Sequence, residues 1–156
     1  MIIRRLTIEF EEWENETTLP EMEAKLLQMA RKATARAYAP YSGFKVGAAI
    51  MLENGEIIQG SNQENSSYPV GTCAERTALF YASSLFPGVK IKAIAISAET
   101  GEPIPPCGMC RQAMLEFETI QNQNIPVIMG GKTGKIWKTS SVGSLLPLQF
   151  DHNHLK

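Results

Sequence analysis

The 156-residue chain has few cysteines and no long apolar run, and both shortages limit what it can be. Three cysteines are an odd number, which suits a metal site or catalytic thiols better than a disulfide framework. Apolar runs of about eighteen residues are absent, so no membrane-spanning helix is predicted. The first residues, MIIRRLTIEFEE, interrupt apolar side chains with charge and so lack the apolar core of a secretory signal. We therefore expect a cytoplasmic protein.

The chain also lacks an excess of either charge, because 15 Lys and Arg residues face 16 Asp and Glu residues for a net charge of −1. This balance argues against a broad basic surface for nucleic acid or for anionic membranes. Repeats and low-complexity segments are absent as well. The composition, 44% hydrophobic and 20% charged, and the length predict one globular domain with a core that needs no disulfides.

Hydrophobic periodicity predicts alternating helices and strands. Residues 44–62 contain two apolar runs around Asn54-Gly55, a strong signal for a two-residue hairpin turn. Further elements are expected as helices over residues 20–38, 73–86 and 108–118, a strand over 90–97, two strands within 125–140, and an edge strand over 2–10. From the helix over residues 20–38 onward, the order of elements predicts an α/β fold with a mixed sheet of about five strands covered by helices.

The three cysteines lie at the starts of two predicted helices. Cys73 begins one helix, and Cys107 and Cys110 form a Cys-x-x-Cys sequence at the start of the next. The free amides and the dipole at a helix N-terminus favour thiolates, and several thiolates that face one point suit zinc. Three protein ligands leave one position of a tetrahedral ion open, as in catalytic zinc sites.

Glu75 lies two residues beyond Cys73, on the apolar stripe of its predicted helix. A buried carboxylate beside a cation needs a partner or a purpose, and it could transfer protons during hydrolysis. Arg76 and Arg111 directly follow Cys73–Glu75 and Cys110 in the chain. We hypothesise that both arginines donate to the sulfurs and offset the excess negative charge of three thiolates around Zn²⁺.

Other interpretations of the cysteines remain open at this point. A structural zinc would need a fourth protein ligand, for which His152 and His154 near the C-terminus are the candidates. Cys107 and Cys110 could instead form a redox pair, although such a pair requires neither a third cysteine nor a buried glutamate. Cysteines that serve only as packing residues would leave Glu75 unexplained.

Cys-x-Glu followed by Pro-Cys-x-x-Cys resembles the signature of the zinc-dependent nucleoside deaminases. The chain is similar to the small, homotetrameric, three-cysteine cytidine deaminases from about residue 22 to Phe150. The similarity is densest in four blocks, APYSGFKVGAA, GSNQENSSYPVGTCAERTAL, PPCGMCRQAMLEF and SLLPLQF. Four blocks in the same order are far more specific than a single Cys-x-x-Cys sequence.

The resemblance implies a three-layer α-β-α sandwich with a mixed five-stranded sheet. It implies hydrolytic deamination of cytidine and 2′-deoxycytidine in pyrimidine salvage. Cys73, Cys107 and Cys110 would bind Zn²⁺, and Glu75 would carry protons between the attacking water, ring N3 and the departing ammonia. The expected division of the chain is an extension over residues 1–18, a deaminase domain over 19–150 and a polar tail over 151–156.

The same resemblance assigns roles in substrate binding. Phe44 would border the base, and the main-chain amide of Ala74 would bind the pyrimidine O2. Asn62 and Glu64 would bind the ribose, although the residues alone are equally compatible with an ordinary polar loop. Tyr68 would pack across a subunit interface, and Phe150 would reach a neighbouring subunit's site. A homotetramer with shared active sites is therefore expected.

Three other functions are alternatives to the deamination of cytidine. The protein could deaminate another small amino-pyrimidine or nucleoside analogue, but a free base would give Asn62 and Glu64 nothing to bind. It could deaminate cytosine in a polynucleotide, although the net charge offers little for that. It could also be a zinc-stabilised binding module without catalysis, which a closed, four-ligand site would reveal.

Overall fold

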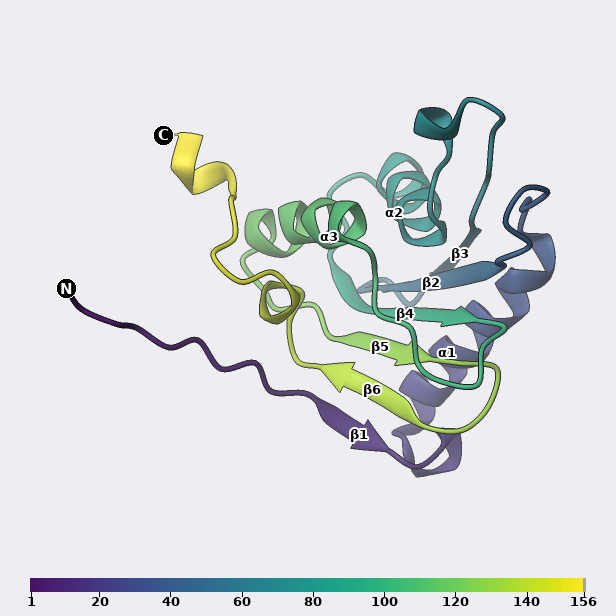
Figure 1. Ribbon diagram of the computed structural model, residues 1–156, viewed down its shortest axis with the longest axis horizontal. Helices are drawn as coiled ribbons and strands as arrows, with labels where there is room; N and C mark the ends of the chain where they lie inside the picture. The colour runs from purple at the N-terminus through teal and green to yellow at the C-terminus, as the bar shows by residue number, and fades with distance from the viewer. Residues whose placement is uncertain (156) are drawn as a thin grey trace.

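The structure is a computed structural model, and it describes residues 1–155. A single sheet of six strands runs through it in the order β1-β6-β5-β4-β2-β3 (Figure 1). The strands are β1 (Glu11–Trp13), β2 (Val46–Leu52), β3 (Ile57–Ser61), β4 (Ile91–Ala98), β5 (Val127–Gly130) and β6 (Ile136–Thr139), and the helices are α1 (Glu21–Ala33), α2 (Ala74–Leu85) and α3 (Gly108–Ile120).

The sheet is mixed, as the sequence predicts. β2 and β3 form an antiparallel hairpin whose turn contains Gly55 at a φ of +89°, a conformation that glycine adopts without strain. β4 and β5 pair in parallel, with Ile96 opposite Met129, and α3 forms the crossover between them. This connection brings the start of α3 to the same end of the sheet as the start of α2.

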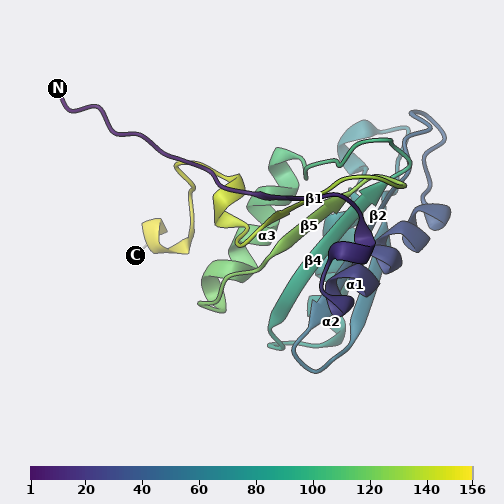
Figure 2. The same ribbon diagram turned by 90° about the horizontal axis from the view of Figure 1, so that it is seen from below.

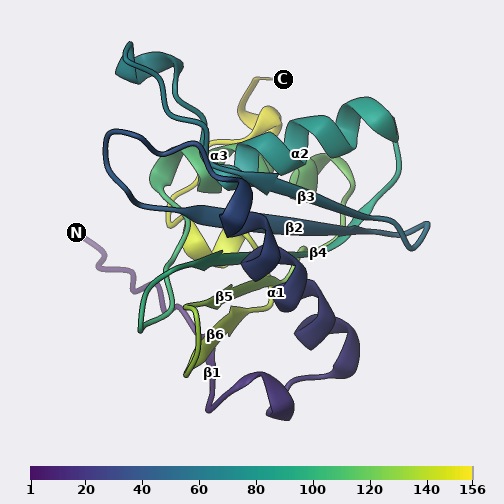
Figure 3. The ribbon, with the colours of Figure 1, turned by 90° about the vertical axis from the view of Figure 1, so that its right-hand side faces the viewer.

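Three layers are formed, because α1 covers one face of the sheet and α2 and α3 cover the other (Figure 3). Two glycines allow the helices to approach the central strands closely. A Cβ at Gly47 would lie 2.1 Å from the carbonyl oxygen of Ala30 in α1, and one at Gly60 would lie 2.5 Å from the amide of Ala78 in α2. The close approach at Gly60 fixes the depth at which α2, and therefore Cys73, lies over the sheet.

The sheet differs from the prediction in its sixth strand. Residues 2–10 form no strand, whereas residues 11–13 pair antiparallel with β6, with Glu12 opposite Trp137. The physical reason is the short partner strand: in this register the last residue of β6, Thr139, lies opposite Phe10, so β6 offers no ladder to residues 2–9. None of the helices within residues 1–155 has both the length and the apolar character that a membrane span requires.

Candidate metal centre and active site

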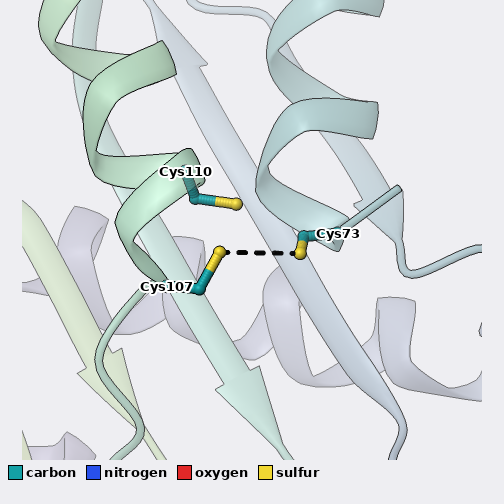
Figure 4. A group of neighbouring side chains, drawn as sticks. All are labelled: Cys73, Cys107 and Cys110. Carbon is teal, nitrogen blue, oxygen red and sulfur yellow. Dashed lines mark hydrogen bonds between the residues drawn. The ribbon is translucent and has the colours of Figure 1, made fainter. Parts of the chain in front are cut away.

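The three cysteine sulfurs converge at the N-termini of α2 and α3. Cys73 and Cys107 immediately precede the two helices, and Cys110 lies in the first turn of α3 (Figure 4). The Sγ atoms of Cys73 and Cys107 are 3.8 Å apart, and all three Sγ atoms lie within 4.8 Å of one another. Cys110 is fully buried, Cys73 is half-buried and Cys107 is exposed, so the cluster has one side open to solvent.

This geometry fits zinc. Zn–S bonds of about 2.3 Å in a tetrahedron place the sulfurs about 3.8 Å apart, close to the separation of Cys73 and Cys107. Among residues 1–155, the group of potential ligands contains these three cysteines and no histidine. Neither candidate for a fourth protein ligand, His152 or His154, belongs to that group among the described residues.

The thiols influence one another's protonation. The Cys110 thiol, together with Cys107 and Arg76, lowers the pKa of Cys73 to about 5. The same interaction with Cys73, reinforced by burial, raises the pKa of Cys110. The three sulfurs are therefore too close to become thiolates together without a compensating cation, and a divalent ion would supply that compensation.

Arg76 lies beside the sulfurs. Burial acts to lower the pKa of its guanidinium, but Cys73 and Cys110 outweigh this effect and raise that pKa. Arg76 Nη2 lies 3.4 Å from the carbonyl oxygen of Gly71, and Nε is buried without a hydrogen-bond partner in the part of the chain described. An unpaired buried donor next to negative sulfurs agrees with a charge-compensating position.

Arg111 makes different contacts from those expected. Its Nε donates to the carbonyl oxygen of Pro106 at 2.8 Å, and its Nη1 donates to that of Leu145, also at 2.8 Å. These bonds replace the expected donation to a sulfur. Arg111 thus ties the loop before Cys107 to the segment that follows β6, because α3 carries the guanidinium between the two.

Glu75 is buried on the inner side of α2, with 4% of its surface exposed. Burial raises the pKa of its carboxyl group, and the negative charge of Cys73 adds to the increase. A carboxylate in this position is poorly compensated by its surroundings and therefore readily holds a proton. Its helix begins at the cysteine cluster, so this buried carboxyl group lies next to the sulfurs.

The two residues expected at the ribose, Asn62 and Glu64, support the loop before β2. Asn62 Oδ1 accepts from the amide of Val46 at 2.8 Å, and Asn62 Nδ2 donates to the carbonyl oxygen of Phe44 at 2.9 Å. Glu64 accepts from the amide of Tyr41 at 2.9 Å and from the hydroxyl of Ser42. Both side chains therefore shape the backbone that presents Phe44, which is about half exposed.

A cavity of about 400 Å³ lies beside Glu64. Tyr41, Ser42, Tyr68 and Gly71 also line it, and the rings of Tyr41 and Tyr68 meet edge to face at 6.0 Å. The hydroxyl of Ser42 and the amides of Tyr41 and Ser42 lower the pKa of Glu64, so this wall of the cavity carries a carboxylate. Sequence reasoning missed Tyr41 and Ser42, although both stand in the APYSGF block.

The structure also places Ala74 and Phe150, two further residues expected at the site. Ala74 is buried in the first turn of α2, where main-chain amides have no partner within the helix. Phe150 is 56% exposed, and its ring stacks on His154 at 5.4 Å. Its carbonyl oxygen accepts from Gln112 Nε2 of α3 at 2.9 Å. Phe150 is therefore held near α3 by its main chain while its side chain stays available to solvent or to another subunit.

Glu118 is a second buried carboxylate, and the sequence analysis missed it. It follows Cys110 and Met114 on the buried side of α3, so the helical spacing that singled out Glu75 would also have found it. Its oxygens accept from the amides of Ile125, Val142 and Gly143 and from the hydroxyl of Ser141, at 2.6–2.9 Å. Glu118 is saturated by its own chain and anchors the segment after β6, whereas the burial of Glu75 is poorly compensated.

Known proteins match this chain over most of its length. Residues 20–125 match a family described as the cytidine and deoxycytidylate deaminase zinc-binding region. A cytidine deaminase from Sporosarcina psychrophila is 46% identical over 132 residues, which are 84% of this chain and 93% of that protein. Another, from Halalkalibacterium halodurans, is 44% identical over 126 residues, 80% of this chain and 91% of that protein.

A solved structure agrees with these sequences. The crystal structure of cytidine deaminase from Burkholderia pseudomallei is 42% identical, with a TM-score of 0.75 over 85% of this chain and all of that chain. The family match covers more than half of the sequence, and the fold and the cysteine cluster agree with it. The chain therefore belongs to the zinc-dependent cytidine and deoxycytidylate deaminase family, with zinc as its cofactor.

Proposed function

We propose that the protein hydrolyses cytidine and 2′-deoxycytidine to uridine and 2′-deoxyuridine with release of ammonia. The observation that carries this proposal is the position of Glu75, a buried carboxyl group two residues beyond Cys73 and beside three converging sulfurs. The sequence and fold similarity to cytidine deaminases supports the same reaction.

Cys73, Cys107 and Cys110 would hold the zinc ion, with Arg76 offsetting their charge. When bound by three protein ligands, zinc supplies an open position at which water becomes acidic enough to act as a nucleophile near neutral pH. The exposed side of the cluster at Cys107 supports access for water and substrate.

Glu75 would move the protons. Its carboxylate accepts a proton from the attacking water and donates it to N3 of the ring, which prepares C4 for attack. It then takes the remaining proton of the added water and transfers it to the amino group. The bond between C4 and the amino nitrogen breaks, and ammonia leaves. The raised pKa of Glu75 supports this role, because the group must hold a proton and release it within one cycle.

The remaining residues would position the nucleoside. The amide of Ala74 at the start of α2 would donate to the pyrimidine O2, and Phe44 would border the base. Asn62 and Glu64 would bind the ribose hydroxyls. Glu64 and Tyr68 line the 400 Å³ cavity, which supports a sugar at that place. Fixed contacts of this kind supply several kcal/mol of positioning.

A substrate panel tests the reaction. We expect the zinc-loaded protein to consume cytidine and deoxycytidine, with cytosine turned over at a kcat/KM roughly 100-fold lower because it lacks the sugar contacts. Ultraviolet absorbance measures the loss of each cytosine ring, with deoxycytidine monophosphate and a cytosine oligonucleotide as further substrates. Glu64→Gln should reduce the preference for cytidine over cytosine.

Three results of the panel would contradict the proposal. Faster turnover of free cytosine would indicate another amino-pyrimidine as substrate, and selective turnover of the oligonucleotide would indicate a polynucleotide. Zinc bound without any turnover would indicate a binding module.

The proposal includes a homotetramer with shared active sites. Its support is the outer face of α2, where Phe80, Tyr81 and Leu85 are each about half exposed and form an apolar surface that monomers rarely leave open. Tyr68 and Phe150 are also exposed, as expected for side chains that reach another subunit.

Complementation between two inactive variants tests whether Phe150 acts in another subunit. Glu75→Gln and Phe150→Ala should each have low activity alone. Coexpression should restore activity to about one quarter of the wild-type turnover, because random mixing gives that fraction of sites an intact Glu75 and an intact neighbouring Phe150. Mixed assemblies without recovery would show that Phe150 serves its own chain. Mass spectrometry of the intact assemblies confirms that mixing occurred.

The proposal extends to compartment and to chain organisation. Three reduced thiols at one site favour the cytoplasm, where pyrimidine salvage would use the reaction products. We retain the division into an extension (1–18), a deaminase domain (19–150) and a polar tail (151–156). The last residue of that tail, Lys156, lies outside the described residues.

A further inference from the structure

The first ten residues, here called the N-terminal arm, precede the part of the chain that the family match covers. That match begins at residue 20, and 85% of this chain suffices to cover the whole Burkholderia protein. The arm continues from β1 as an extended segment and projects away from the body of the molecule (Figures 1 and 2). It is therefore an addition whose purpose the catalytic domain does not explain.

The arm exposes more apolar surface than a solvated tail would. Its large apolar side chains are all exposed, with the lowest fraction, 47%, at Ile8; they are Met1, Ile2, Ile3, Leu6, Ile8 and Phe10. Two open cavities, of about 400 and 570 Å³, lie between the arm and residues 138–149, so its own chain covers it poorly. An extended segment with exposed apolar side chains at the edge of a sheet favours pairing with another such segment.

The charges of the arm determine which partner fits. Arg4 and Arg5 stand in its first half, whereas Glu9, Glu11 and Glu12 stand at its end and in β1. Within residues 1–155, Arg4, Arg5 and Glu9 form no ion pair, whereas Glu12 pairs with Lys135 at 2.6 Å and Glu11 lies 3.9 Å from Lys138. A second copy would therefore bring Arg4 and Arg5 to carboxylates that each have one lysine neighbour. A second copy laid antiparallel brings the basic half of each arm to the acidic half of the other. A parallel arrangement would instead place like charges opposite one another, which is unfavourable.

We propose that the N-terminal arms of two copies of this chain pair as antiparallel strands and join their sheets edge to edge. The best register places Ile8 opposite Ile8 of the second copy. Arg4 then faces Glu12, Arg5 faces Glu11 and Leu6 faces Phe10, so that each of these charges meets its opposite and each apolar side chain meets an apolar one. The pairing is the same from either copy, as a two-fold interface requires.

The sheet can accept this addition. Among residues 1–155, β1 is the outermost strand and pairs with β6 alone, so its other edge has no partner there. The arm continues directly from that edge, and a second arm can add to β1 through main-chain hydrogen bonds. The interface is separate from the α2 face and from the cysteine cluster, so it does not depend on the catalytic proposal.

Disulfide crosslinking tests the pairing on the full-length, zinc-loaded protein. Ile8→Cys places two thiols at the two-fold axis, so mild oxidation should give a disulfide-linked dimer on a non-reducing gel. Ile3→Cys is the matched control, because its counterpart in this register is Trp13. It should stay at the background of the wild-type protein, which retains the three native cysteines. Equal crosslinking of the two variants, or none in either, would overturn the proposal.

Charge reversal tests the same pairing in a second way. In the Ile8→Cys protein, Arg5→Glu alone or Glu11→Arg alone places like charges opposite each other at two positions and should give roughly tenfold less dimer. Coexpression of the two charge variants should restore the dimer, because each mixed pair regains both ion pairs. Dimer yields that do not recover would rule out this register. Cytidine turnover, measured in parallel, should be unchanged in all of these variants, so a failure of the pairing is distinguishable from a failure of the proposed reaction.

Discussion

Glu75→Gln is expected to lower kcat for cytidine by about 10²- to 10⁴-fold, the range that a positioned acid–base group contributes. Glutamine has nearly the same volume as glutamate but cannot accept and release the protons. It should therefore fill the buried position on α2 without disturbing the cysteine cluster. Turnover, metal analysis and thermal unfolding of the purified variant measure these three properties separately.

Glu116→Gln provides the matched control for this experiment. Glu116 also lies on a helix, α3, but its side chain is exposed. Its variant should keep wild-type turnover and wild-type zinc content. Substantial activity in Glu75→Gln with zinc bound would disprove the proposed proton transfer, whereas loss of zinc in that variant would assign Glu75 to metal retention instead.

Cys110→Ser should remove zinc and activity together. Cys110 is fully buried, its Sγ lies within 4.8 Å of the other two sulfurs, and a serine hydroxyl is a poor replacement for a thiolate ligand. A ligand present at about 1,000 times its dissociation constant stabilises a protein by about 4 kcal/mol. Loss of zinc should therefore lower Tm by roughly 8–16 °C for a domain of this size.

Met109→Leu is the control for the cysteine variant. Met109 lies between Cys107 and Cys110 in the chain, but its side chain is exposed and is not part of the sulfur cluster. Its variant should keep one zinc per chain, normal turnover and an unchanged Tm. Added zinc should raise the Tm of the wild-type apoprotein but not that of Cys110→Ser, and an equal increase in both would contradict the assigned ligand.

The sequence was most informative where local spacing and chemistry agree. Asn54-Gly55 fixed a hairpin because that turn is specified within a few residues. The apolar stripe around Glu75 and the cysteines at two helix starts predicted an inward carboxylate beside a sulfur cluster. The first prediction depends on a local turn and the second on helical periodicity, and a single segment determines each of these for itself.

The arginines and carboxylates near the site were harder to predict, because their partners come from distant parts of the chain. Arg111 follows a cysteine in sequence but donates to Pro106 and Leu145, since α3 turns its side chain toward those loops. Glu118 lies on the buried side of its helix, as Glu75 does. Four donors from residues 125–143 nevertheless make Glu118 an anchor for that segment.

The sequence by itself determined the order of helices and strands, the helix starts that carry Cys73, Cys107 and Cys110, and the inward direction of Glu75, because residue spacing within one element sets these features. Only the tertiary structure decided that β1 adds a sixth strand, that Arg76 rather than Arg111 lies beside the sulfurs, and that Glu118 is saturated. These features depend on contacts between segments far apart in the chain. The folded backbone alone determines which donors and acceptors meet there.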